Sequence, residues 1–180
     1  GRSAWVDLRN SGTVRALRLD PAADGLSVTA DGAPVARMAT ARPVPRLEES
    51  PFIVFWETTR ACDLVCKHCR ADAHPGRDPQ ELTFEEGTRL LDDVRAMGCP
   101  LVVLTGGDPA KRPDLVELVR HGSSIGLHMA LTPSATPLVT RGFLARLADA
   151  GLARLAVSLD GLSPASHDGF RGVAGSHART

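Results

Sequence analysis

Several residue types are scarce in this 180-residue chain, and the scarcities narrow what the protein can be. Tyr is absent, aromatic residues make up only 4%, and among the 21 basic residues only Lys67 and Lys111 are Lys. With Ala abundant, we interpret this bias as coding preference rather than function. The 21 basic residues are balanced by 21 acidic ones, so the charge gives no indication of a nucleic-acid partner.

Long apolar runs are missing as well. No stretch approaches the roughly 18 apolar residues of a membrane span, and no signal peptide is visible, so we expect no membrane association. Four Cys without a secretory signal fit a reducing compartment, the cytoplasm, better than a disulfide framework. The length allows one domain with a real core. Because the chain starts at Gly1 and stops at Thr180 at no obvious boundary, we expect it to be part of a longer protein.

Residues 1–50 differ in composition from the rest and are expected to form an N-terminal extension. Short alternating runs at Val14 to Leu19 and Leu26 to Thr29 are separated by a turn signal, and Asp31-Gly32 supplies a second one. A weak β-hairpin or meander fits this pattern. A disordered leader fits it equally well.

From residue 51 to 180 the pattern becomes regular and predicts a core domain. Apolar runs of strand length alternate with amphipathic helical segments, which indicates an α/β fold with a parallel sheet and outer helices. Right-handed crossovers would curl such a sheet into an open or closed barrel. We expect strands at Phe52–Trp56, Leu101–Leu104, Leu127–Leu131 and Arg154–Leu159, and helices that begin at Thr83, Pro113 and Thr140.

The sequence indicates which residues of each helix face inward. Thr83 with Glu86 reads as a capping box. The helix that follows would place five apolar residues on its inner face, Phe84, Leu90, Leu91, Val94 and Met97. The helix after Pro113 would bury Leu115, Leu118 and Val119, and the one after Thr140 would bury Phe143, Leu144 and Leu147.

Every polar motif follows the end of one of these strands. A CxxxCxxC run, formed by Cys62, Cys66 and Cys69, follows the first, and Thr105-Gly106-Gly107-Asp108-Pro109 follows the second. Thr132-Pro133-Ser134 follows the third, and Ser158-Leu159-Asp160-Gly161 ends the fourth. Since the carboxyl ends of parallel strands meet at one edge, we expect all four motifs on the same rim.

The three cysteines are the most informative feature. Thiolates are the usual ligands of iron–sulfur clusters, and a four-iron cube needs four of them for full ligation. Three therefore leave one iron open to a small molecule, or they borrow a fourth ligand. The competing interpretations are an iron–sulfur electron-transfer module, a zinc site completed by His68 or His74, and buried thiols. Cys99, between a helix end and a buried strand, is expected to be structural.

In type, order and spacing these motifs resemble the radical S-adenosylmethionine (SAM) superfamily over roughly residues 51–175. WETTRACDLVCKHCRA, LTGGDP and HDGFRGVAGS are most similar to members with a C-terminal SPASM cluster domain, which mature ribosomal peptides or act in alternative haem synthesis. The resemblance implies a partial (β/α)6 TIM-like barrel, truncated after about four βα units. It also implies reductive cleavage of SAM to a 5′-deoxyadenosyl radical that abstracts hydrogen from a peptide or tetrapyrrole-like substrate.

The resemblance also implies cofactors, partners and site residues. Cys62, Cys66 and Cys69 would ligate a [4Fe-4S] cluster whose open iron is chelated by SAM, and a flavodoxin or ferredoxin would donate the electron. His68 occupies the adenine-contacting position, and Gly106, Gly107, Asp108 and Pro109 that of the methionine amino group, where the family often has Glu in place of Asp108. Ribose contacts would come from Thr132, Ser134, Ser158 and Asp160, and a contact with the SAM carboxylate from Arg171.

The remaining histidines have no matched partners in the sequence. We expect His74, His121, His128, His167 and His177 to be surface or loop residues. An inactive fragment of the enzyme is the last alternative, because an open edge strand after Leu159 would be exposed.

Overall fold

The computed structural model describes residues 17–22, 25–30, 33–39 and 50–180. Contacts divide the chain into two compact units, residues 1–44 and 45–180. The functional division into an extension of residues 1–50 and a core of residues 51–180 stays a prediction.

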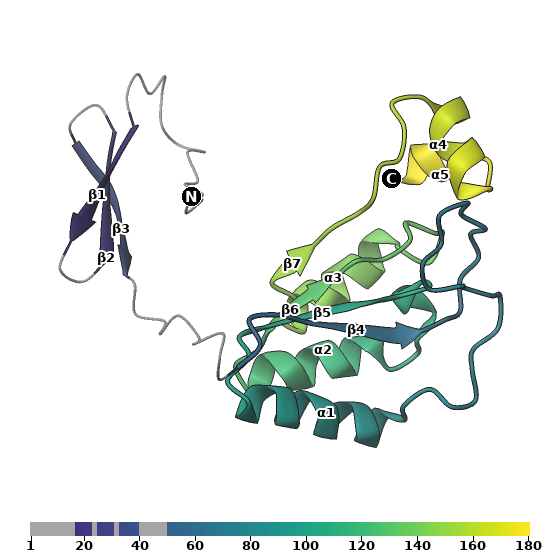
Figure 1. Ribbon diagram of the computed structural model, residues 1–180, viewed down its shortest axis with the longest axis horizontal. Coiled ribbons are helices and arrows are strands. Elements are labelled where there is room, and N and C mark those ends of the chain that lie inside the picture. Colours follow the sequence, from purple (N-terminus) through teal and green to yellow (C-terminus); the bar gives the residue numbers. More distant parts are fainter. Residues whose placement is uncertain (1–16, 23–24, 31–32, 40–49) are drawn as a thin grey trace. The chain divides into compact units, whose positions relative to one another are not determined.

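The first unit contains an antiparallel sheet. Strands β1 (Leu17–Ala22), β2 (Gly25–Ala30) and β3 (Ala33–Ala39) pair in the order β1-β2-β3, as shown in Figure 1. They lie where the alternating runs predicted a meander. The start of the first run, residues 14–16, lies outside the described residues, as do the turn residues 23–24 and 31–32.

The second unit is built on a parallel sheet. Strands β4 (Val54–Thr59), β5 (Leu101–Gly106), β6 (His128–Leu131) and β7 (Arg154–Leu155) pair in chain order. Helices α1 (Phe84–Ala96), α2 (Leu115–Ser124) and α3 (Arg141–Asp149) connect successive strands. In Figure 1, α1 and α2 lie side by side along one face of the sheet. The predicted α/β architecture with parallel strands is confirmed.

Local sequence explains why α1 begins and ends where it does. Thr83 accepts a hydrogen bond from the Glu86 amide (3.2 Å), and the Glu86 carboxylate accepts one from the Thr83 amide (2.9 Å), so the predicted capping box is present. Gly98, with φ +81°, stops the helix. The inward face is narrower than predicted, because Phe84 is 37% exposed and Met97 is 50% exposed. Phe84 is the first residue of α1 and Met97 follows its last, so both lie beyond the part of the helix that packs on the sheet.

The core lies between the sheet and the three connecting helices. Its residues come from the first three βα units, so the packing fixes the ends of β4, β5 and β6, which the cysteine and glycine motifs and Ser134 follow. Cys99 belongs to it as expected, with 1% exposure. The largest members of this buried cluster are Leu91, Leu104, Leu115, Leu118, Leu127, Met129, Leu131, Phe143 and Leu147.

The fourth strand is shorter than predicted. We expected it to run from Arg154 to Leu159, but β7 covers only Arg154–Leu155. The reason is its neighbour, since β6 ends at Leu131 and the last bond to it is the one from the Ala156 amide to the Leu131 carbonyl (3.0 Å). The Ser158–Gly161 motif therefore follows the strand at some distance instead of forming its end.

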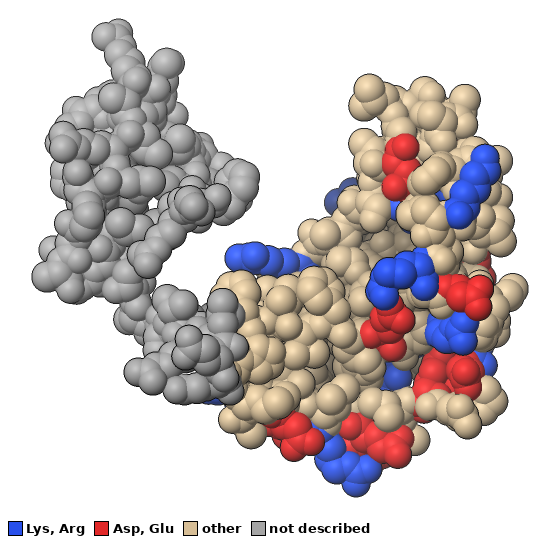
Figure 2. Space-filling model, viewed as in Figure 1, with Lys and Arg blue, Asp and Glu red and all other residues tan. Residues whose placement is uncertain are grey.

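Three short helices complete the unit. The 3-10 helix η1 (Pro109–Lys111) follows β5, and α4 (Pro164–Arg171) and α5 (Ser176–Arg179) follow β7. No helix within the described residues combines the length and the apolar character that crossing a membrane requires. On the face drawn in Figure 2, acidic and basic side chains are interspersed.

Candidate active site

The three cysteines lie in a loop that leaves the carboxyl end of β4 and is closed at its base. The Cys62 amide donates to the His74 carbonyl (2.9 Å), and the His74 amide donates to the Arg60 carbonyl (3.1 Å). Cys62 is buried, Cys66 is half-buried and Cys69 is exposed, and all three are free thiols. The depth of the three thiols thus decreases along the loop, from the buried Cys62 to the exposed Cys69.

Backbone donors face two of the sulfur atoms. The Leu64 amide donates to the Cys62 sulfur (3.4 Å), and the Ala73 amide donates to the Cys69 sulfur (3.4 Å). Hydrogen bonds of this kind stabilise a thiolate relative to a thiol. The loop backbone thus contacts both of these sulfur atoms directly.

The third sulfur lies in a different electrostatic environment. Burial raises the pKa of the Cys66 thiol above its ordinary value, the Arg171 guanidinium opposes this rise, and the neighbouring Cys62 and Cys69 add to it. The three thiols are therefore close enough to influence one another. Ionising all three together requires a compensating cation, and metal binding supplies one by displacing the thiol protons.

The donor set fits an iron–sulfur cluster by its chemistry. Among the residues that the structure describes, no three His, Cys, Asp or Glu side chains are grouped to hold one metal ion. A single zinc ion needs donors that converge to about 2 Å from one point. Cluster thiolates bind different irons, so they need not converge in that way. Three thiols, two of them facing amide donors and one beside a guanidinium, are the type of donor that such a cluster takes.

The two glycines after β5 lie against the base of the cysteine loop. The Gly107 amide donates to the Thr59 carbonyl (2.8 Å). A Cβ at Gly106, whose φ is +138°, would lie 2.2 Å from the Thr59 carbonyl oxygen, and one at Gly107 would lie 2.6 Å from the oxygens of Arg60 and Ala61. Only glycine allows this approach. The contact with the cysteine loop therefore already requires glycine at both positions. Their contact with SAM stays a prediction.

Asp108 joins the ends of two strands. Its carboxylate is fully buried and accepts from the Ala110 amide (3.1 Å), the Ser134 amide (3.3 Å) and the Thr136 hydroxyl (2.6 Å). These bonds cap η1, which Pro109 opens, and hold the segment after β6. Thr136 escaped the sequence analysis because nothing in its neighbourhood marks it as a partner of a residue so far away in the chain.

Of the two hydroxyl residues expected after β6, Ser134 contacts the cysteine loop. Its hydroxyl donates to the Gly107 carbonyl (2.7 Å) and lies 3.6 Å from the Cys62 sulfur. The Thr132 amide donates to the Leu104 carbonyl (3.0 Å), so Thr132 continues the pairing of β5 with β6. Ser134 therefore links the cysteine and glycine motifs directly.

Helix α4 contacts the cysteine loop at the other side. The Val65 amide donates to the Arg171 carbonyl (3.1 Å), and the Lys67 amide donates to the Phe170 carbonyl (3.0 Å). The last carbonyls of a helix have no hydrogen-bond donors within that helix. For α4, amides of the cysteine loop supply these donors. The His68 ring stacks on the Phe170 ring, with centroids 4.5 Å apart and planes at 18°. Position 68 thus carries a ring held flat against α4, and its contact with adenine stays a prediction.

The other expected residues meet around Arg171, which is 8% exposed. Its guanidinium donates to the Asp160 carboxylate and to the Ser158 carbonyl (3.0 Å). The Asp160 amide donates to the His167 ring (3.1 Å). His167 has no exposed surface, so its assignment as a surface or loop residue was wrong. The pairing at Asp160 explains this, since the ring packs inward to accept that bond.

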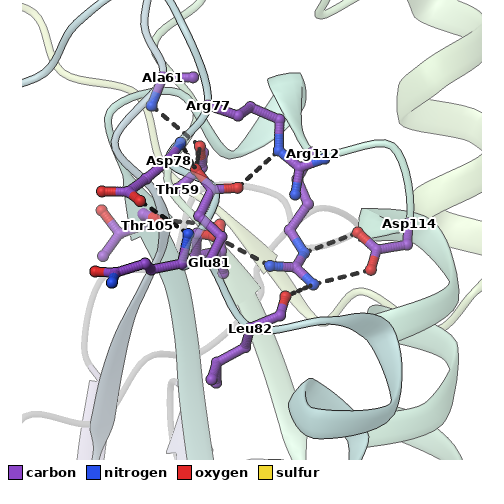
Figure 3. Close-up of polar contacts among 11 residues, drawn as sticks. Thr59, Ala61, Arg77, Asp78, Glu81, Leu82, Thr105, Arg112 and Asp114 are labelled. Carbon is purple, nitrogen blue, oxygen red and sulfur yellow. Dashed lines mark hydrogen bonds and ion pairs between the residues drawn. The ribbon is translucent and has the colours of Figure 1, made fainter.

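A second polar network, which no sequence pattern indicated, lies around Arg112 (Figure 3). Arg112, 2% exposed, donates to the carbonyls of Thr58 (3.2 Å) and Leu82 (2.8 Å) and pairs with Asp114. Its guanidinium also lies 5.5 Å from the centroid of the Trp56 ring. Arg112 thus joins the end of β4 to the segment that enters α1.

Comparisons with known proteins find a matching family and several similar enzymes. The sequence profile of the radical SAM superfamily matches residues 56–179. The chain is 44% identical over 123 residues to an AdoMet-dependent heme synthase of Oleidesulfovibrio alaskensis, covering 68% of this chain and 31% of that protein. It is 40% identical over 129 residues to a PqqA peptide cyclase of Rhodopseudomonas palustris, covering 72% of this chain and 34% of the relative. Both relatives are named as enzymes, in agreement with the class expected from the sequence.

Solved structures resemble the fold at lower identity. SuiB of Streptococcus suis, bound to the precursor peptide SuiA, superposes with a TM-score of 0.62 and 20% identity, covering 72% of this chain and 29% of SuiB. This likeness supports the expected partial barrel. The chain spans about a third of the length of the curated relatives that it matches. On the match over residues 56–179, the chain belongs to the radical SAM superfamily.

Proposed function

We propose that this chain is the cluster- and SAM-binding part of a radical SAM enzyme, in which Cys62, Cys66 and Cys69 each bind one iron of a [4Fe-4S] cluster. When bound and reduced, the cluster supplies the electron that cleaves SAM to methionine and a 5′-deoxyadenosyl radical, which takes hydrogen from the substrate. The observation that carries the proposal is the cysteine loop, which the glycine motif, Ser134 and α4 contact from separate directions. Such support fixes the ligands before the metal arrives.

The remaining residues of the rim would bind and orient SAM at the open iron. We propose that the backbone of residues 106–109 lies along the methionine end and that His68 contacts the adenine. Thr132, Ser134, Ser158 and Asp160 would contact the ribose hydroxyls. The rim residues would also keep water away from the reacting atoms.

Arg171 is proposed to contact the SAM carboxylate. A guanidinium has five N–H donors, which exceed the contacts that Arg171 makes with Asp160, Ser158 and Cys66. Donors therefore remain for a carboxylate, which a planar fork suits. The same residue can orient Asp160 and bind the ligand.

The substrate is proposed to be a peptide or a tetrapyrrole. Support comes from the names of the relatives, since the heme synthase shares 44% identity with this chain and the peptide cyclase 40%. A tetrapyrrole is therefore the first substrate to test. A flavodoxin or ferredoxin is the proposed electron donor. The cytoplasm is the proposed compartment, because all four cysteines are free thiols.

Electron paramagnetic resonance on anaerobically reconstituted, dithionite-reduced protein tests the proposal. We expect a four-iron signal that changes when SAM is added. Cys66→Ala should abolish or strongly reduce the signal, whereas Cys99→Ala, a matched change in the core, should leave its shape intact. A cluster signal indifferent to SAM would overturn the proposal in favour of an electron carrier, and a protein that binds zinc but no cluster would overturn it in favour of a zinc site.

A further inference from the structure

The base of the cysteine loop rests on a chain of three polar groups, drawn in Figure 3. The Ala61 amide donates to the Thr59 hydroxyl (3.0 Å), and that hydroxyl donates to the Glu81 carboxylate. Ala61 directly precedes Cys62, the most buried of the three thiols. A carboxylate in the segment that enters α1 is thus connected through one hydroxyl to the residue before the first cysteine.

Glu81 is itself firmly held. The side chain is 7% exposed, and its carboxylate accepts from the Arg77 guanidinium (2.7 Å) and the Asp78 amide (3.2 Å). Burial alone would raise the pKa of Glu81, but the hydrogen bonds from Thr59, Arg77 and Asp78 outweigh it and hold the pKa below its ordinary value. Glu81 is therefore a carboxylate near neutral pH and acts as an acceptor.

An ionised Glu81 decides how the Thr59 hydroxyl points. A hydroxyl has one hydrogen and two lone pairs, so giving its hydrogen to Glu81 turns a lone pair toward the Ala61 amide. Thr59 is 1% exposed, so no bulk water competes for either role. With the carboxylate removed, the hydroxyl could rotate and leave the Ala61 amide without a fixed acceptor.

The orientation of Ala61 in turn fixes Cys62. The Ala61 carbonyl accepts from the Asp108 amide (2.7 Å), and the Cys62 amide donates to the His74 carbonyl (2.9 Å). With its amide held by Thr59, residue 61 is bound on both sides. Little rotation is then left for the backbone from which the Cys62 side chain projects.

We propose that Glu81 is a positioning residue for the Cys62 thiolate and acts through the Thr59 hydroxyl. This inference rests on the proposed function, because it assumes that Cys62 binds the cluster. Groups that orient metal ligands without touching the metal typically change metal affinity about 10- to 100-fold when removed. Glu81 and Thr59 have this relation to Cys62.

The test compares variants of the full-length protein by the rate of iron release from the reconstituted cluster to a chelator. Thr59→Val keeps the shape and removes the hydroxyl, and we expect iron release to accelerate by roughly tenfold or more. Thr59→Ser keeps the hydroxyl and should restore a rate within about twofold of the original. Glu81→Gln keeps an oxygen for Thr59 but places an amide donor against Arg77, so its rate should lie between the two.

A matched control separates positioning from general stability. Glu86→Gln weakens the capping box of α1, close in sequence to Glu81, and has no part in the contacts of Thr59. We expect it to lower the midpoint of unfolding while leaving iron release unchanged. The double variant Thr59→Val with Glu81→Gln should release iron no faster than Thr59→Val alone, because both changes break one chain of contacts.

The outcomes distinguish failure of this inference from failure of the proposed function. If the unaltered protein binds no cluster, the proposed function fails. If it does bind a cluster, and Thr59→Val releases iron at the original rate, the positioning role is refuted. Equal acceleration in Glu86→Gln and Glu81→Gln also refutes it, since the effect would then follow from loss of stability. Should Thr59→Val not fold, Glu81→Gln and Thr59→Ser decide the question by the same comparison.

Discussion

Replacing Gly107 with alanine adds one methyl group at the contact between the glycine motif and the cysteine loop. The new Cβ would lie 2.6 Å from the carbonyl oxygens of both Arg60 and Ala61. Neither oxygen can retreat freely, because the loop base is closed by the bond from Cys62 to His74. Either the loop base or the glycine motif must therefore move.

The size of the effect follows from what the movement would break. The Gly107 amide would lose its bond to Thr59, and the Asp108 amide its bond to Ala61. Each such bond contributes about 0.5–1.5 kcal/mol. Forcing a methyl group into a filled space costs about 1–3 kcal/mol more. We therefore expect the Gly107→Ala change to lower the free energy of unfolding by about 2–6 kcal/mol, out of about 5–15 kcal/mol for a typical domain.

Gly142 provides the matched control. It lies in α3, and a Cβ there would have no atom within 4 Å. Gly142→Ala should raise the free energy of unfolding by about 0.5–1 kcal/mol, since alanine loses less backbone entropy in a helix. Urea unfolding followed by circular dichroism measures both variants. A loss of less than about 1 kcal/mol for Gly107→Ala would refute the reasoning, because the carbonyls would then yield at little cost.

Three further changes test other contacts. Gly172 has φ +72° and lies against the cysteine loop, so Gly172→Ala should lower the free energy of unfolding by about 1–3 kcal/mol. Gly169→Ala, where a Cβ would meet no neighbour within 4 Å, should raise it slightly, and the urea midpoints of the two variants test both expectations. Hydrogen bonds, the one from the His177 amide foremost, hold the pKa of Asp168 below its ordinary value. Its stabilising contribution is therefore present above the unfolded pKa of about 4 and lost as the pH falls through the folded value, so Asp168→Asn should flatten the acid side of a plot of melting temperature against pH. Arg112→Met leaves the half-buried Asp114 carboxylate and the carbonyls of Thr58 and Leu82 without their guanidinium donor. We expect a loss of about 1–3 kcal/mol in urea unfolding, and an unchanged midpoint would contradict these contacts.

The parts of the fold that the sequence predicted well depend on local patterns. The capping box of Thr83 and Glu86 is set by residues three apart, and the structure reproduces it. The rim position of the cysteine and glycine motifs follows from parallel strands alone, since their carboxyl ends meet at one edge. β7 was overestimated because strand length depends on the neighbour, and β6 stops at Leu131.

The parts that escaped prediction depend on contacts between distant segments. Glu81 lies just before a capping box and reads as an ordinary polar residue, yet its carboxylate contacts Thr59. Arg112 reads as a surface cation in a turn, yet it is buried. His167 lies only seven residues from Asp160, but its bond comes from a backbone amide, which no residue type in the sequence reveals. Each role depends on the tertiary fold, which a pattern of spacing and polarity does not encode.

The contact between α4 and the cysteine loop has a consequence for the order in which the protein matures. The amides of Val65 and Lys67 bind carbonyls of Arg171 and Phe170, which the ribosome adds far later. Because the ribosome adds roughly 5–20 residues per second, these partners are synthesised on the order of ten seconds after the cysteines. Until then the loop lacks one of its supports, and contacts so distant in sequence also form slowly. Cluster insertion should therefore follow the synthesis and docking of α4, and thiols exposed in the interval are the ones most in need of protection from oxidation.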